Sequence, residues 1–161
     1  MKSNFEVLAG KHIVPEVILY GDGSSYPNPG PAGYAFILKH VKTGRIKEGS
    51  GGIKEGTNNI AELTAILEGL KCLKRPVNLE IVTDSQYVCK GLAVWIHNWK
   101  SKGKLNDGSS LSNLKLWQEL DRLIQPHQVK YTWVRGHTGH KYNERCDQLA
   151  MAARIAISQN H

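Results

Sequence analysis

The chain of 161 residues lacks the features that hold together many secreted and membrane proteins. Its cysteines, Cys72, Cys89 and Cys146, are odd in number and form no Cys-x-x-Cys pair, so we expect no disulfide scaffold. No apolar run is long enough to span a bilayer, and the N-terminus has none that fits a signal peptide. These absences predict a cytoplasmic protein with no membrane partner, and nothing in the pattern asks for more than a monomer.

Two nucleotide-binding signatures are also missing. No Gly-Lys-Ser/Thr loop follows a predicted strand and no Gly-x-Gly-x-x-Gly occurs, which disfavours nucleotide-dependent chemistry. Acidic residues are scarce as well: residues 85–106 contain none, and 21 Lys and Arg against 14 Asp and Glu give a net charge of +7. This excess favours an anionic partner such as nucleic acid, although many basic proteins bind no anion.

The length and the hydrophobic periodicities predict one α/β domain. We expect an antiparallel meander of three strands joined by parallel strands into a five-stranded mixed sheet flanked by helices. The predicted strands are 17–21, 33–39, 45–53, 77–83 and 129–134. The predicted helices are one capped by Thr57 or Asn58, segments 86–92, 93–101 and 113–125, and a last one capped by Asn143. Residues 1–16 are expected to form a loosely ordered extension.

Four carboxylates lie where the chain leaves a predicted strand or opens a helix. Asp22 and Asp84 each follow a short β-rich run, Glu62 lies on the sheet-facing side of the first helix, and Asp147 neighbours Cys146 on the packing side of the last. Taken singly, each has an ordinary structural explanation, as a turn residue or as an acid near a helix start. As a set they indicate a hard divalent cation, which takes oxygen ligands.

The loop 135–141 and the segment 90–104 carry further candidates. His137, in a loop with two glycines, could transfer protons near neutral pH, or it could be a solvated side chain. A zinc site from His137, His140 and Cys146 is a weaker alternative because it lacks a fourth ligand. Trp95 and Trp99 lie in the same segment as the basic residues His97, Lys100 and Lys102, which suits a nucleic-acid backbone, although their i, i+4 spacing also fits core packing.

Several segments in series resemble ribonuclease H of the bacterial type 1 group, from about residue 17 to 157. The segments that carry the resemblance are Asp22-Gly23-Ser24, Asn28-Pro29-Gly30, Thr57-Asn58-Asn59-Ile60-Ala61-Glu62-Leu63, Thr83-Asp84-Ser85-Gln86-Tyr87-Val88, Trp95-Ile96-His97-Asn98-Trp99, Trp133-Val134-Arg135-Gly136-His137 and Asn143-Glu144-Arg145-Cys146-Asp147. The resemblance divides the chain into an extension (1–16), a ribonuclease H domain (17–157) and a short tail (158–161).

The resemblance implies a role for particular residues. Its metal-binding carboxylates fall on Asp22, Glu62, Asp84 and Asp147, and its mobile-loop histidine on His137. Its RNA-strand contacts fall on Asn28, Asn58, Asn59 and Gln86. Its DNA-phosphate pocket falls on Thr57 and Asn113, and its DNA-sugar aromatic on Trp95.

The activity that the resemblance implies is endonucleolytic cleavage of the RNA strand of an RNA–DNA hybrid, leaving a 5′-phosphate and a 3′-hydroxyl. The cofactor implied is Mg²⁺, with Mn²⁺ a possible substitute, as two ions about 4 Å apart across the scissile phosphate. Amide side chains can detect 2′-hydroxyls as donor and acceptor, and little base readout is expected, so sequence specificity should be low.

The chain departs from the family pattern in its basic segment and before the helix glutamate. Lys100-Ser101-Lys102-Gly103-Lys104 carries fewer basic residues than well-known bacterial members and no aromatic at Lys104, and Ile60 replaces a frequent basic residue.

Two other functions are a hybrid-binding module that no longer cuts and a nuclease or transposase on a related sheet. The first is disfavoured because all four acids and His137 are present, and the second because it would lack the amide positions and the Trp95 segment.

Overall fold

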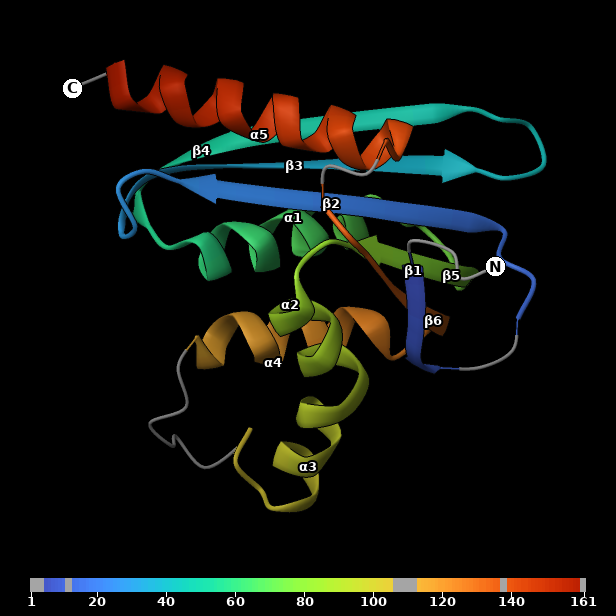
Figure 1. Ribbon diagram of the computed structural model, residues 1–161. Helices are drawn as coiled ribbons and strands as arrows, with labels where there is room; N and C mark the ends of the chain where they lie inside the picture. The colour runs from blue at the N-terminus through green and yellow to red at the C-terminus, as the bar shows by residue number, and fades with distance from the viewer. Residues whose placement is uncertain (1–4, 11–12, 106–112, 137–138, 160–161) are drawn as a thin grey trace.

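The computed structural model describes residues 5–10, 13–105, 113–136 and 139–159. Its centre is a six-stranded mixed sheet in the order β1-β6-β5-β2-β3-β4 (Figure 1). Strands β2, β3 and β4 form the antiparallel meander, whereas β5 is parallel to both β2 and β6. The strands are β1 (Phe5–Gly10), β2 (Val17–Ser25), β3 (Gly30–His40), β4 (Ile46–Gly56), β5 (Asn78–Thr83) and β6 (Gln128–Val134).

Helices cover both faces of the sheet. Helix α5 lies across β3 and β4 on one face, while α1, α4 and the α2–α3 segment lie on the other (Figure 1). The helices are α1 (Asn58–Lys71), α2 (Gln86–Lys90), the π-helical turn η1 (Gly91–Trp95), α3 (Ile96–Ser101), α4 (Leu114–Ile124) and α5 (Lys141–Gln159). Within the described ranges, no helix has the length and apolar character needed to cross a membrane.

The predicted five-stranded mixed sheet flanked by helices is confirmed, but the prediction for residues 1–16 is wrong in part. Phe5–Gly10 forms the strand β1, which pairs antiparallel with β6 from Phe5 opposite Val134 to Gly10 opposite Lys130. An edge strand such as β6 has unpaired backbone N–H and C=O groups, and a neighbouring segment of the same chain can satisfy them. The N-terminal segment does so and extends the sheet by one strand.

The cap predicted for the last helix is also wrong. Helix α5 begins at Lys141, and the backbone N–H of Glu144 donates a 2.9 Å hydrogen bond to the carbonyl of His140. Asn143 therefore lies inside the first turn, where its side chain is buried. Asn is favoured at a cap, but here the first helical hydrogen bond is accepted three residues earlier, by His140.

The two faces of the sheet bury apolar cores of different size. The larger core lies between the sheet and α1, α4 and the α2–α3 segment, with the fully buried Trp117 in it and Trp133 packed against it. The smaller lies under α5 and includes Cys146, while Cys72 is only partly buried. A Cβ on Gly33 would lie 2.5 Å from the backbone nitrogen of Arg154, so α5 rests directly on β3.

Candidate metal centre and nucleic-acid interface

Two of the predicted carboxylates come from neighbouring parallel strands. Asp84 directly follows β5, whose last pairing with β2 joins Thr83 to Gly21. Asp22 lies one residue beyond that pairing, but inside β2 rather than after it, because β3 continues to pair with the strand and places Ala35 opposite Asp22. The two carboxylates therefore lie at the same end of neighbouring strands. The predicted first strand ended at residue 21, four residues before the end of β2 at Ser25.

The third carboxylate, Glu62, is brought to this edge by the start of α1. Thr57, one of the two residues predicted as the cap, accepts a 3.0 Å hydrogen bond from the backbone N–H of Ile60, and Asn58 is the first helical residue. The helix then passes so close to β2 that a Cβ on Gly23 would lie 2.5 Å from the carbonyl carbon of Ala61. Glycine is thus required at position 23 for the first turn of α1 to approach the strand.

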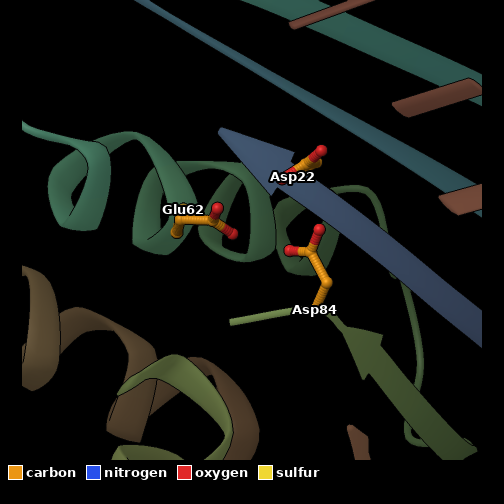
Figure 2. Close-up of side chains that lie close together, drawn as sticks. All are labelled: Asp22, Glu62 and Asp84. Atoms are coloured by element: carbon orange, nitrogen blue, oxygen red, sulfur yellow. The ribbon is translucent and has the colours of Figure 1, made fainter. Parts of the chain in front are cut away.

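The three side chains converge. One carboxylate oxygen from each of Asp22, Glu62 and Asp84 lies within 4.8 Å of the other two, and Figure 2 shows the three side chains close together, with Glu62 and Asp84 directed toward each other. Asp22 is only 4% exposed, and its Oδ1 accepts a 2.9 Å hydrogen bond from the backbone N–H of Gly23. The cluster therefore combines oxygen ligands from strand β2, from the end of β5 and from one helix.

The pKa values of these acids reflect their crowding. Burial, followed by the charge of Asp84, raises the pKa of Asp22 to about 8, against an ordinary value of 3.8. Burial and the charges of Asp22 and Asp84 also raise the pKa of Glu62 well above its usual range. Neighbouring carboxylates in a desolvated space resist ionisation unless a cation offsets their charge.

The donor set fits a hard divalent cation. Glu62 Oε2 is buried and has no hydrogen-bond partner among the described residues, although a buried polar atom normally has one. An ion such as Mg²⁺ bound between the three carboxylates would give this oxygen a partner and would favour the ionised form of all three.

The other two predicted members of the site stand apart. Asp147 is half-buried on α5 and lies outside the 4.8 Å cluster, but its charge contributes, as the smallest named effect, to the raised pKa of Asp22. His137 lies outside the described residues. Its neighbour Gly136 is described, and a Cβ there would lie 3.0 Å from Asp84 Oδ2, so the loop begins against the carboxylate.

The zinc alternative gains no support from the two of its ligands that lie within the described residues, Cys146 and His140. Cys146 is fully buried under α5, and burial raises the pKa of its thiol, which disfavours the thiolate that zinc binds. His140 borders a different space, beside Glu80 and Thr132.

Five of the predicted substrate-binding residues gather around a hollow of about 480 Å³. Its lining residues are Asn28, Pro29, Thr57, Asn58, Asn59 and Asn113. The amides are held in place by the β2–β3 turn: Asn28 Oδ1 accepts hydrogen bonds from the Ser25 hydroxyl at 3.0 Å and from the backbone N–H of Asn58 at 3.1 Å. Asn58 Oδ1 in turn accepts from the backbone N–H of Ser25 at 2.8 Å.

Trp95 and Asn113 are connected by a residue that sequence reasoning missed. The hydroxyl of Tyr87 accepts 3.3 Å hydrogen bonds from Asn113 Nδ2 and from the indole of the buried Trp117. The Tyr87 ring also meets the ring of the half-buried Trp95 edge-on, at 5.9 Å between centroids. The signal for Tyr87 was its place directly after Gln86, which is exposed at the start of α2.

Known proteins match this chain over most of its length. The RNase H family model matches residues 15–155. The ribonuclease H of Cupriavidus metallidurans is 50% identical over 136 residues, which cover 84% of this chain and 92% of that protein. Among solved structures, LC9-RNase H1, a type 1 RNase H with the type 2 active-site motif, superimposes with a TM-score of 0.77 at 27% identity, covering 91% of this chain and 75% of that one.

A second solved structure, LC11-RNase H1 in complex with an RNA/DNA hybrid, has the same fold, with a TM-score of 0.65 at 21% identity. It covers 87% of this chain and 97% of the LC11 chain. The family match takes in strands β2 to β6, the carboxylate cluster and the amide-lined hollow, but not β1. The chain therefore belongs to the ribonuclease H family, in its bacterial type 1 group.

Proposed function

We propose that this enzyme cleaves the RNA strand of RNA–DNA hybrids endonucleolytically, with little sequence specificity, and leaves 5′-phosphate and 3′-hydroxyl ends. The observation that carries the proposal is the position of three converging carboxylates beside a hollow lined by four asparagines and Thr57. A metal-binding cluster suits phosphodiester hydrolysis, and exposed amides suit 2′-hydroxyl recognition.

Asp22, Glu62 and Asp84 would hold Mg²⁺, with Asp147 as a further ligand and Mn²⁺ as a possible substitute. When bound, two such ions supply an activated water and stabilisation of the leaving 3′-oxygen. The carboxylates would fix the position of the scissile phosphate because they come from the paired strand β2, the end of β5 and one capped helix. His137 would accept or donate a proton near that phosphate or assist product release.

The remaining residues would distinguish a hybrid from either duplex. Asn28, Asn58, Asn59 and Gln86 would read 2′-hydroxyls on the RNA strand as donors and acceptors. Thr57 and Asn113 would bind a phosphate of the DNA strand, and Trp95 would pack against a DNA sugar. Since these contacts reach the backbone rather than base edges, they carry little sequence information. We further propose that the enzyme acts as a monomer in the cytoplasm.

Cleavage of labelled nucleic acids tests the proposal. The purified protein with Mg²⁺ should cut RNA only when it is paired with DNA, and a chelator should stop cutting. Single-stranded RNA, double-stranded RNA and double-stranded DNA of the same sequence serve as controls. Equal cutting of single-stranded RNA would contradict the substrate assignment, and hybrid binding without cutting under all metal conditions would indicate a binding module instead.

The Asp84→Asn variant tests the metal assignment separately. It removes one ligand charge while keeping the size of the side chain, and we expect cleavage to fall by more than about a hundredfold, since even outer partners of metal ligands cost about 10- to 100-fold. Hybrid binding measured in chelator should be retained. Undiminished cleavage by this variant would exclude Asp84 as a metal ligand.

A further inference from the structure

The guanidinium of Arg154 lies over the ring of Tyr26, 5.8 Å from its centroid. Arg154 is on α5, and Tyr26 is in the turn between β2 and β3, which lies near the C-terminal half of the helix (Figure 1). The Tyr26 side chain is 74% exposed, an unusual fraction for a large aromatic residue in an ordered turn. An exposed ring with a cation against it forms a flat, positively charged surface.

The β2–β3 turn connects this surface to the proposed substrate-binding hollow. Tyr26 follows Ser25 and precedes Asn28, and those two residues are hydrogen-bonded to each other. The turn is closed by a 3.1 Å hydrogen bond from the backbone N–H of Tyr26 to the carbonyl of Pro31. Because the backbone of Arg154 rests on Gly33, which pairs with Ser24, the arginine lies at the same end of the sheet as the carboxylate cluster.

Among the described residues, no carboxylate pairs with the charge of Arg154. In the part of the chain that the structure describes, no ion pair involves Arg154, and its half-buried side chain has a buried Nε with no hydrogen-bond partner. Arg145, on the same helix, differs because it is paired with Glu48 through contacts of 2.9 Å and 3.2 Å. A guanidinium that no carboxylate neutralises is suited to an anion from outside the protein.

From these observations we infer that Tyr26 and Arg154 form an additional binding site for the RNA strand, beyond the asparagines of the hollow. Arg154 binds one backbone phosphate through its guanidinium, and the Tyr26 ring packs against the adjoining ribose or base. The inference rests on the proposed function, since it takes the strand that reaches Asn28 to be the RNA strand of the hybrid. It adds one phosphate contact on a face formed by α5.

The salt dependence of binding tests this site. Dissociation constants for a fluorescently labelled hybrid are measured by anisotropy in chelator, over a range of salt concentrations, for the unaltered protein and for Arg154→Ala. Loss of one phosphate contact should weaken binding severalfold at low salt and reduce the slope of log affinity against log salt by about 0.7–0.9. Arg154→Lys, which keeps the charge, should keep most of the slope.

Three further variants separate a local contact from a general effect of charge. Arg45→Ala removes the same charge from an exposed turn at the start of β4, at the opposite end of β3, and should leave the slope unchanged. Tyr26→Ala should weaken binding without changing the slope, whereas Tyr26→Phe should bind nearly as well as the unaltered protein. Thermal unfolding verifies that each variant is folded.

The outcomes distinguish this inference from the proposed function. If the unaltered protein fails to bind a hybrid, the proposed function is wrong. If it binds, but Arg154→Ala and Arg45→Ala have the same slope as the unaltered protein, only the additional site is wrong. Should Arg154→Ala fail to fold, Arg154→Gln gives the same charge loss with a longer side chain, and Tyr26→Ala tests the site independently.

Discussion

The indole Nε1 of Trp133 donates a 2.9 Å hydrogen bond to the backbone carbonyl of Asp84. Trp133 is on β6 and pairs in register with Thr83, the last residue of β5. The side chain thus reaches across to the first residue beyond its parallel neighbour and fixes the direction in which the chain leaves that strand. Strand β6 therefore helps to orient Asp84, the residue that directly follows β5.

Replacing Trp133 by phenylalanine tests this role. The ring packing against the larger core is largely kept, but the hydrogen bond to Asp84 is lost, so the free energy of unfolding should fall by about 1 kcal/mol. We expect a larger effect on turnover than on hybrid affinity, because Asp84 would lose its fixed orientation. Steady-state kinetics and urea unfolding measure the two effects, and an unchanged kcat would show that Asp84 is oriented by other contacts.

Glycine 23 offers a second test of how the site is assembled. The Gly23→Ala variant places a Cβ against the backbone of Ala61, which cannot move aside as a side chain can. We expect α1 to shift away from β2, a loss of about 1–3 kcal/mol in unfolding free energy, and reduced affinity for Mg²⁺.

Gly21→Ala is the matched control on the same strand. Its Cβ would meet Cδ1 of Ile66 at 2.7 Å, the end of a side chain that can change rotamer. The loss of stability and of metal affinity should therefore be smaller than at position 23. Equal losses in the two variants, measured by urea unfolding and calorimetric Mg²⁺ titration, would mean that the approach of α1 to β2 does not set the metal site.

The elements of the fold that depend on neighbouring residues in the chain could be predicted from the sequence. Alternation and apolar spacing predicted the meander, the parallel strands and α1, because those signals reside in consecutive residues. The Thr57 cap and the sheet-facing position of Glu62 followed from the helix pattern.

Features that depend on a distant partner were not predictable in the same way. The extension of β2 to Ser25 depends on pairing with β3, and the strand β1 exists because β6 has an open edge. The start of α5 depends on the backbone hydrogen bond between Glu144 and His140, which competes with Asn143 as a cap. Similarly, Tyr87 and Trp133 act through hydrogen bonds to residues far away in the chain, for which no local pattern exists.

Removal of the N-terminal strand should destabilise the protein. Deleting residues 1–12 leaves the outer edge of β6 unpaired, and we expect the free energy of unfolding to fall by about 2 kcal/mol, equivalent to a few backbone hydrogen bonds at about 1 kcal/mol each. The exposed edge should also promote association at high concentration, detectable by light scattering. Deleting residues 1–4 alone is the control, since it spares β1. Equal stability of the two truncated forms would show that the strand pairing contributes nothing.

The stability of the metal-free protein should depend on pH through Asp22. The unfolded chain loses the Asp22 proton near its ordinary pKa of 3.8, whereas the folded, metal-free protein keeps it until the pKa of about 8. Between these values the unfolded state binds fewer protons, so in chelator the free energy of unfolding should decrease as the pH rises from about 4 to 8.

Asp22→Asn removes this titration and should be the more stable form at pH 8 by at least about 1.4 kcal/mol, the equivalent of one pKa unit. Mg²⁺ should oppose the decrease in the unaltered protein, because it binds the ionised carboxylates, and should have less effect on the variant. Urea unfolding at several pH values, with chelator or Mg²⁺, measures the pH dependence, the effect of the variant and the effect of the metal. Parallel pH profiles for the two proteins in chelator would contradict the raised pKa of Asp22.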